Sequence, residues 1–136
     1  MINIMYLLDT NVWLERLLNQ EKAEEVGEML DSISSENLYI TDFALHSVGV
    51  ILCKLNKKEA FIKFIEDLFV NSAVNLIHIE PQNMKDIIAT IDKFNLDFDD
   101  AYQYVAAEKY ALTIISFDTD FDRTERGRKT PAEVLK

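Results

Sequence analysis

Short apolar runs that alternate with longer amphipathic stretches are the feature that most constrains the fold of this chain. The first run is followed by Asp9 and the last by Asp118. A short apolar run bounded by polar residues indicates a buried strand, whereas apolar residues three and four positions apart indicate a helix with one inward face. Strands that alternate with helices form parallel sheets covered on both faces. We therefore expect an α/β protein with four or five short strands.

The same pattern places each element along the chain. Strands are predicted at residues 2–8, 38–40, 74–79 and 112–117. Helices are predicted from the cap at Asp9–Thr10 to residue 18, and then at 21–34, 41–55, 57–69, 81–91 and 97–110, with a last short element at 131–135. The chain has 136 residues and only three Gly and two Pro, which argues against long linkers. Residues 1–136 are therefore expected to form a single domain.

Three aspartates should meet in this architecture. Asp9 and Asp118 end strands, and Asp100 opens the helix that precedes the last strand. The carboxyl ends of parallel strands share one edge of the sheet, and ligands bind at that edge. A pocket of carboxylates repels itself unless it holds a cation, and oxygen-only ligands suit Mg²⁺ or Mn²⁺. The sequence thus predicts a divalent metal site.

The overall charge of −10 is unfavourable for contacts with phosphates, which need Lys and Arg. A local basic surface can still exist on an acidic protein. Two basic groups stand out, namely Lys54, Lys57, Lys58 and Lys63, and the tighter group Arg123, Arg126, Arg128 and Lys129. The second group has two interpretations: a solvated tail, or a flank that steers phosphates toward the acidic pocket.

The single cysteine and the lengths of the apolar runs bear on the compartment. Cys53 excludes an internal disulfide, and its apolar neighbours predict a buried, inert thiol. This is compatible with a reducing cytoplasm, which is the expected location. No apolar run approaches the ~18 residues of a membrane span, so no membrane association is expected.

Three segments together resemble the PIN domain family. Leu7–Asn11 resembles the opening strand and turn of these domains, and Asp100–Ala107 resembles the helix that carries their third acidic position. Ile115–Phe121 resembles the closing T-x-D-x-x-F pattern, with Ser116 in place of Thr. Each motif alone is weakly specific, but the ordered set spans most of the chain. The size and the short C-terminal tail are similar to VapC-type toxins of toxin–antitoxin pairs.

The resemblance implies a fold, an activity and partners. The fold is a three-layer α/β/α sandwich with a short central parallel sheet. The activity is that of a metal-dependent endoribonuclease, with Mg²⁺ or Mn²⁺ held by acidic side chains and RNA as the substrate. The implied partners are a cognate antitoxin protein, which inhibits the toxin, and a second copy of the chain in a homodimer.

The resemblance also assigns roles to residues. Asp9, Asp100 and Asp118 are the expected catalytic residues and metal ligands, and Asp120 is a supporting or substitute ligand. Asn11 and Ser116 are expected to contact the substrate or to orient the ligands. Each aspartate has a simpler interpretation beside this one, because Asp9 and Asp100 can cap helices and Asp118 and Asp120 can stabilise a turn. Asp99 competes with Asp100 for the third acidic position.

One position departs from the family pattern. Ser47 stands where the family has a Glu on the helix after the second strand, and a serine hydroxyl is a weak ligand for Mg²⁺. The neighbouring His46 is either a contact for the substrate or a structural histidine. The loss of a carboxylate leaves open a second function, in which the chain is a catalytically impaired PIN-like module that binds RNA or a protein partner.

Other α/β proteins with acidic pockets fit the residues less well. A haloacid-dehalogenase-type phosphatase needs a second Asp two residues after the first, where this chain has Asn11. A response-regulator receiver needs a Lys after its last strands, and residues 116–120 contain none.

Overall fold

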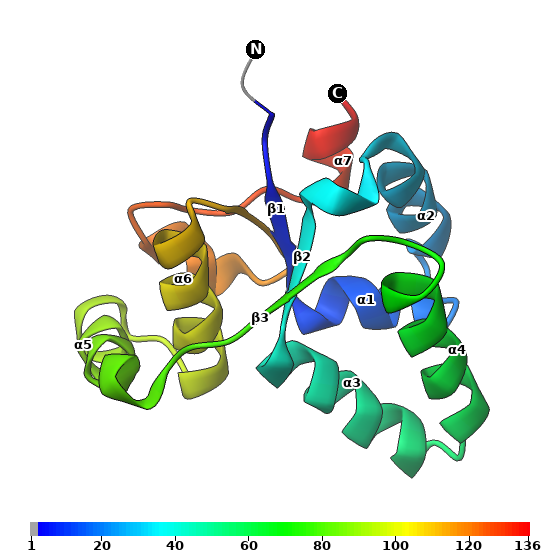
Figure 1. Cartoon of the computed structure of the whole chain (residues 1–136). Coiled ribbons are helices and arrows are strands. Elements are labelled where there is room, and N and C mark those ends of the chain that lie inside the picture. The colour runs from blue at the N-terminus through cyan, green and yellow to red at the C-terminus, as the bar shows by residue number, and fades with distance from the viewer. Residues whose placement is uncertain (1–2) are drawn as a thin grey trace.

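The computed structural model describes residues 3–136, and Figure 1 shows their arrangement. Four strands form one parallel sheet in the order β3-β2-β1-β4. The strands are β1 (Tyr6–Leu8), β2 (Leu38–Thr41), β3 (Asn75–Ile77) and β4 (Thr113–Ile115). In this register Leu8 lies opposite Ile115, and Thr41 lies opposite Ile77.

Seven α-helices and three short 3₁₀ helices are found among the described residues. The α-helices are α1 (Thr10–Leu17), α2 (Ala23–Ser32), α3 (Asp42–Lys54), α4 (Lys58–Phe69), α5 (Met84–Phe94), α6 (Phe98–Tyr110) and α7 (Pro131–Leu135). The 3₁₀ helices are η1 (Ser35–Asn37), η2 (Pro81–Asn83) and η3 (Thr119–Arg123). None of the helices in residues 3–136 is both long enough and apolar enough to cross a bilayer.

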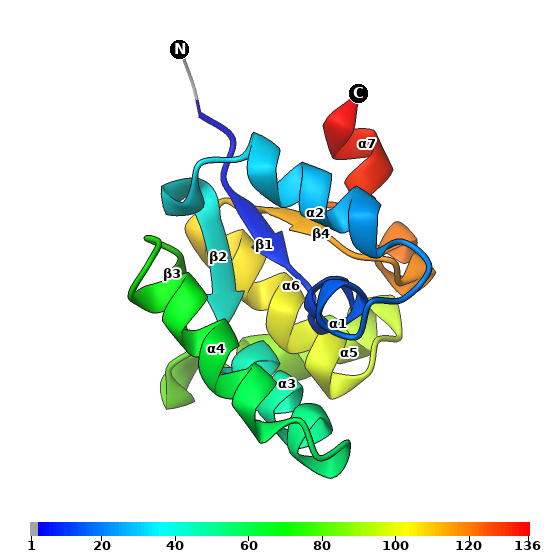
Figure 2. The same cartoon turned by 90° about the vertical axis from the view of Figure 1, so that its right-hand side faces the viewer.

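The sheet divides the apolar core into two halves because successive side chains of a strand point to opposite faces. Leu8 and Ile115 face one core, which is covered by α1, α2, α3 and α4, and Leu7 and Ile114 face the other, which is covered by α5 and α6. The two helical layers lie on opposite sides of the strands in Figure 1 and again in Figure 2. The predicted three-layer α/β/α sandwich is therefore confirmed.

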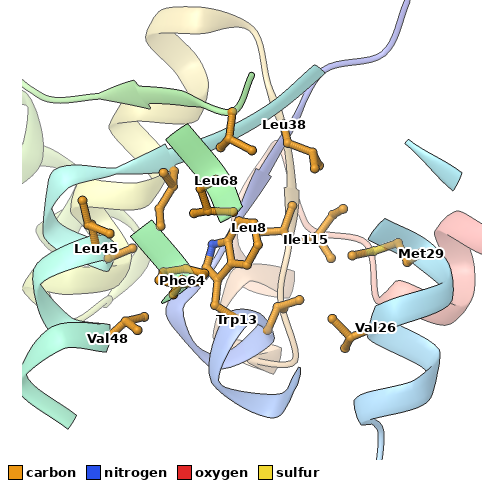
Figure 3. Close-up of a cluster of buried hydrophobic side chains, with 14 of the residues drawn as sticks. Leu8, Trp13, Val26, Met29, Leu38, Leu45, Val48, Phe64, Leu68 and Ile115 are labelled. Carbon is orange, nitrogen blue, oxygen red and sulfur yellow. The ribbon is translucent and has the colours of Figure 1, made fainter. Parts of the chain in front are cut away.

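Trp13 lies at the centre of the first core. Its indole packs edge-on against Phe64, with ring centroids 5.4 Å apart, and Figure 3 shows it surrounded by Leu8 and Leu68. Only 3 % of Trp13 is exposed. Trp13 and Val12 are the buried residues of α1, so their packing holds this helix directly below the end of β1.

Three of the four strands are shorter than their apolar runs predicted, whereas β2 extends one residue beyond the predicted range 38–40, to Thr41. The predicted strand 2–8 is paired from residue 6, and its first residue lies outside the described range. The runs 74–79 and 112–117 are paired only at 75–77 and 113–115. Beyond β4, the Ser116 amide donates to the Lys129 carbonyl in an isolated parallel bridge, and Ser116 stays buried while Phe117 is half-buried. The apolar runs are longer than the hydrogen-bonded strands because residues that flank the strands are also buried.

The prediction for Cys53 is wrong, because its thiol is exposed. Helix α3 turns Ala44, Val48 and Leu52 inward. Adjacent helical residues are separated by about 100° around the helix axis, so the residue after Leu52 points away from the core. The apolar stretch before Cys53 reflects a helix with a wide apolar surface.

Candidate functional site

The fold brings four aspartates to the carboxyl edge of the sheet. Asp9 follows β1 and Asp118 follows the adjacent strand β4, while Asp100 lies in the first turn of α6. Asp100, Asp118 and Asp120 each place one carboxylate oxygen within 4.8 Å of the others. We call Asp9, Asp100, Asp118 and Asp120 the acidic cluster.

Asp9 is fixed by hydrogen bonds from three directions. The Ser116 hydroxyl donates to Oδ2 at 2.7 Å, the Thr10 amide donates to Oδ1 at 2.9 Å, and the Gln103 side-chain amide lies 3.4 Å from Oδ1. Burial raises the pKa of Asp9, and the hydrogen bond from Ser116 opposes this rise most strongly. The carboxylate is therefore held in one orientation at some electrostatic cost.

Asp100 also has a raised pKa. Burial, followed by the charges of Asp9, Asp99 and Asp118, raises its pKa to about 8. Only 6 % of Asp100 is exposed, and in residues 3–136 no Lys or Arg forms a salt bridge with Asp9, Asp100 or Asp118. A bound cation would relieve both the repulsion and the loss of hydration. The exposed Asp99 competes poorly for this buried position.

Ser116 links the two strand ends through its hydroxyl. This oxygen donates to Asp9, accepts from the Asp118 amide at 2.9 Å, and lies 3.4 Å from the amide nitrogen of Asn11. Asn11 in turn accepts from the Phe117 amide at 3.3 Å. The structure thus brings Asn11 and Ser116 together with the acidic cluster, and both orient its backbone and its carboxylates.

Gln103 and Thr41 were not expected in the site. The Thr41 hydroxyl donates to Gln103 Oε1 at 2.6 Å and accepts from the Ala44 amide at 3.0 Å, where it caps α3. Gln103 is 2 % exposed and Thr41 is fully buried. Gln103 therefore connects the start of α3 to Asp9. The sequence did contain a signal for Gln103, because it is a polar residue among the inward-facing residues of α6, one turn after Asp100.

His46 and Ser47 lie in the first half of α3. Together with Phe43, Val50 and Ile51 they line a mainly apolar hollow of about 360 Å³. Among the described residues, no hydrogen bond joins either side chain to the acidic cluster. Asp42 is the acidic residue nearest to Ser47 in the sequence. Its carboxylate accepts a hydrogen bond of 2.8 Å from the Tyr102 hydroxyl.

The arginines beyond β4 are engaged within the chain. Arg128 bonds to both carboxylate oxygens of Asp122, at 3.1 and 3.2 Å, and to the Ser116 carbonyl at 3.1 Å. Arg123 contacts Asp120 at 2.9 Å and two carbonyls at the end of α5, and Arg126 contacts the Leu112 carbonyl. We call Arg123, Arg126 and Arg128 the arginine clamp. These contacts anchor the three side chains, although Arg123 and Arg126 remain exposed. The solvated tail and the phosphate-steering flank both stay predictions.

Comparisons with known proteins agree with this architecture. The sequence profile of the PIN domain matches residues 6–127. No match is found among curated proteins. A toxin–antitoxin complex from Klebsiella pneumoniae contains a similar chain, with 22 % identity, a TM-score of 0.75, and coverage of 93 % of this chain and 97 % of that one.

Two further solved structures are similar over most of their length. FitAcB from Neisseria gonorrhoeae is 24 % identical with a TM-score of 0.73, and the match covers 94 % of this chain and 99 % of that one. VapC20 from Mycobacterium tuberculosis, a toxin that cleaves the sarcin-ricin loop, is 14 % identical with a TM-score of 0.73, and the match covers 86 % of this chain and 92 % of that one. At these identities the structures establish a shared fold. The profile match over most of the sequence establishes the family, and the chain belongs to the PIN domain family.

Proposed function

We propose that this chain is a metal-dependent endoribonuclease and the toxin of a toxin–antitoxin pair. The observation that carries the proposal is the acidic cluster itself. Asp9 and Asp100 are buried beside two further carboxylates, and within residues 3–136 only Asp120 of this cluster forms a salt bridge with a cationic side chain, that of Arg123. Such a group is costly for folding alone, and perturbed acids of this kind gather at functional sites. Membership of the PIN domain family adds independent support.

The donor set fits Mg²⁺ or Mn²⁺. Asp100, Asp118 and Asp120 offer oxygen atoms close together, and Asp9 adds a fourth carboxylate at the same edge of the sheet. Hard cations of this type prefer carboxylate oxygens and need few of them, because water and substrate phosphate complete the shell. When bound, the ion would polarise the scissile phosphate and activate water for attack.

The surrounding residues prepare these carboxylates for that task. Ser116, Gln103 and the Thr10 amide orient Asp9, so little rearrangement is needed when a ligand arrives. Arg123 holds Asp120 at the rim of the cluster, where a free aspartate would otherwise rotate into solvent. The high pKa of Asp100 means that this residue binds a proton at neutral pH until a cation replaces it.

The partners follow from the same proposal. The similar chain from Klebsiella pneumoniae was solved as part of a toxin–antitoxin complex, and VapC20 is described as a toxin that cleaves the sarcin-ricin loop. We expect an antitoxin to inhibit this chain by placing an Arg among the carboxylates, because Arg pairs with carboxylates through two hydrogen bonds. Association into a homodimer and action on RNA in the cytoplasm are further parts of the proposal.

A second candidate function rests on Ser47. In place of a carboxylate, α3 presents a hydroxyl that lines an apolar hollow. If three or four aspartates do not suffice for catalysis, the chain is a PIN-like module that binds RNA or a protein without cleaving it. Substitution of Ser47 by Glu would then increase the affinity for Mn²⁺ and introduce cleavage.

Cleavage of single-stranded and structured RNAs tests the proposal, with Mg²⁺, Mn²⁺ or EDTA in the buffer. We expect cleavage that requires the metal and that is lost in the Asp100→Asn variant. The loss of a ligand should exceed the roughly 10- to 100-fold cost of losing a residue that only orients one. Asp99→Asn is the matched control, because Asp99 is adjacent but exposed, and it should retain activity within about threefold.

The outcomes separate the two functions. Cleavage that survives in Asp100→Asn would remove the acidic cluster from the mechanism. A folded protein that binds RNA without cleaving it would favour the second function. Restored cleavage in the Ser47→Glu variant would then identify the missing carboxylate as the cause.

A further inference from the structure

A cavity of about 500 Å³ opens beside the acidic cluster, between α1, the loop that follows it, and the chain just beyond β4. Asn11 and Phe117 line the cavity and also belong to the hydrogen-bond network of the site. Phe117 lies between Ser116 and Asp118 in the chain. The cavity therefore shares two residues with the hydrogen-bond network that orients the acidic cluster.

The walls of this cavity are apolar and include one aromatic ring. Leu14 comes from α1, Leu18 directly follows this helix, and the half-buried ring of Phe117 comes from the chain beyond β4. The Lys22 ammonium group lies 5.7 Å from the centroid of this ring. Because Lys22 is an exposed and flexible side chain, this contact marks a ring face that a flat ligand can reach.

The rim of the cavity selects against a phosphate. Glu15 and Glu21 line it together with the single cation Lys22, so the rim carries more negative than positive charge. Glu15 also accepts a hydrogen bond of 2.8 Å from the Lys22 backbone amide, which holds the rim in place. A neutral group with N–H donors suits such a rim, because carboxylates accept hydrogen bonds and repel anions.

We propose that this cavity is a nucleobase subsite, in which one unpaired base of the RNA substrate stacks on Phe117. The inference rests on the proposed function, since it names how the same site holds its substrate. Single-stranded RNA is commonly recognised by stacking of splayed bases on aromatic side chains and by hydrogen bonds to base edges. The carboxylate of Glu21 favours a base that carries an amino group, namely guanine, adenine or cytosine, over uracil.

Binding of short RNAs tests this subsite without requiring cleavage. The Asp100→Asn variant is titrated into fluorescent single-stranded ribo-oligonucleotides in which one position at a time lacks its base, and the affinity is measured by anisotropy. Stacking of one base on an aromatic side chain corresponds to roughly a 5- to 160-fold change in affinity. We expect one position whose base contributes a change of this size.

The same series is then repeated with Phe117 altered in the Asp100→Asn background. With Phe117→Leu, removal of the critical base should change the affinity less than about twofold, because the stacking partner is gone. Phe117→Trp should restore the dependence. The control is Phe43→Leu, another half-buried aromatic that lines the separate hollow on α3, and it should leave the dependence intact.

Each remaining outcome overturns the subsite. Equal weakening of all oligonucleotides by Phe117→Leu would assign the ring a structural role. Loss of binding to a protein inhibitor with RNA binding intact would make the cavity a protein-docking surface. If the unaltered chain cleaves RNA but no base depends on Phe117, the subsite fails and the proposed nuclease stands. A folded chain that neither binds nor cleaves RNA overturns both.

Discussion

The acidic cluster and the arginine clamp lie side by side just beyond β4, but they differ in how their buried charges are balanced. In the clamp, the largely buried guanidinium of Arg128 pairs with Asp122 and with a backbone carbonyl. In the cluster, Asp9 and Asp100 are buried and no cationic side chain of the described residues balances them. Pairing lowers the free energy of the folded clamp, whereas burial and repulsion raise that of the cluster. A contribution to folding stability explains the charged pairs of the clamp, but it does not explain the buried carboxylates of the cluster.

The largest expected effect on stability comes from the clamp. Arg128→Met should destabilise the fold by about 2–3 kcal/mol, because it removes charge-assisted hydrogen bonds and leaves a buried carbonyl without its donor. The side chain of Arg128 is only 14 % exposed, so water cannot fully replace it. Equilibrium unfolding in urea, with far-UV circular dichroism as the signal, measures the change. An unchanged midpoint would mean that the clamp contributes nothing to folding.

The helices and the positions of the strands along the chain follow from periodicity, and so does the meeting of Asp9 with Asp118, whereas the order of the strands in the sheet was not predicted. Parallel pairing brings strand ends to one edge whatever the loops between them, so residues 109 positions apart can be placed together from the pattern alone. The lengths of the strands do not follow, because apolar residues such as Ile79 remain buried after the ladder has ended. Hydrophobicity reports burial, whereas pairing depends on which backbone groups face each other.

The contacts of polar side chains were the least predictable part of the site. Gln103 and Thr41 meet across 62 residues, and their hydrogen bond depends on how α6 packs against the start of α3. The charges of the clamp were visible in the sequence, but their partners were not, since Arg128 bonds partly to a backbone carbonyl. Side-chain partners are set by tertiary packing, and a one-dimensional pattern carries little of that information.

The second prediction concerns the acidic cluster, where a substitution should stabilise the fold, in contrast to Arg128→Met. The pKa of Asp100 rises from 3.8 to about 8 on folding, so between these values the folded chain holds a proton that the unfolded chain releases. The stability of the metal-free protein should therefore fall as the pH rises from about 4 to 8. In Asp100→Asn the contribution of Asp100 to this slope should vanish, leaving that of Asp9, whose pKa burial also raises. The variant should be more stable than the parent at pH 8 by about 1–2 kcal/mol.

Thermal unfolding in EDTA across this pH range measures the slope. Asp99→Asn serves as the control, because Asp99 is exposed and its removal should leave most of the slope in place. A parent protein that becomes steadily more stable up to pH 8 would contradict the assignment of a buried, unbalanced carboxylate. Addition of Mn²⁺ at pH 8 should raise the unfolding temperature of the parent and have less effect on Asp100→Asn.

The smallest expected effect on stability comes from an exposed salt bridge. Like the pair of Arg128 and Asp122, it joins a basic and an acidic side chain, but both of its side chains are exposed. Lys93 of α5 reaches Glu125 at 2.7 Å, with 62 % and 71 % of the two side chains exposed. Water and salt screen such a pair, so Lys93→Met should shift the unfolding temperature by about 1 °C or less. Differential scanning calorimetry of Lys93→Met beside Arg128→Met makes the comparison directly. Equal losses in the two variants would show that pairing alone stabilises this segment, whereas the expected difference assigns the effect to the burial of Arg128.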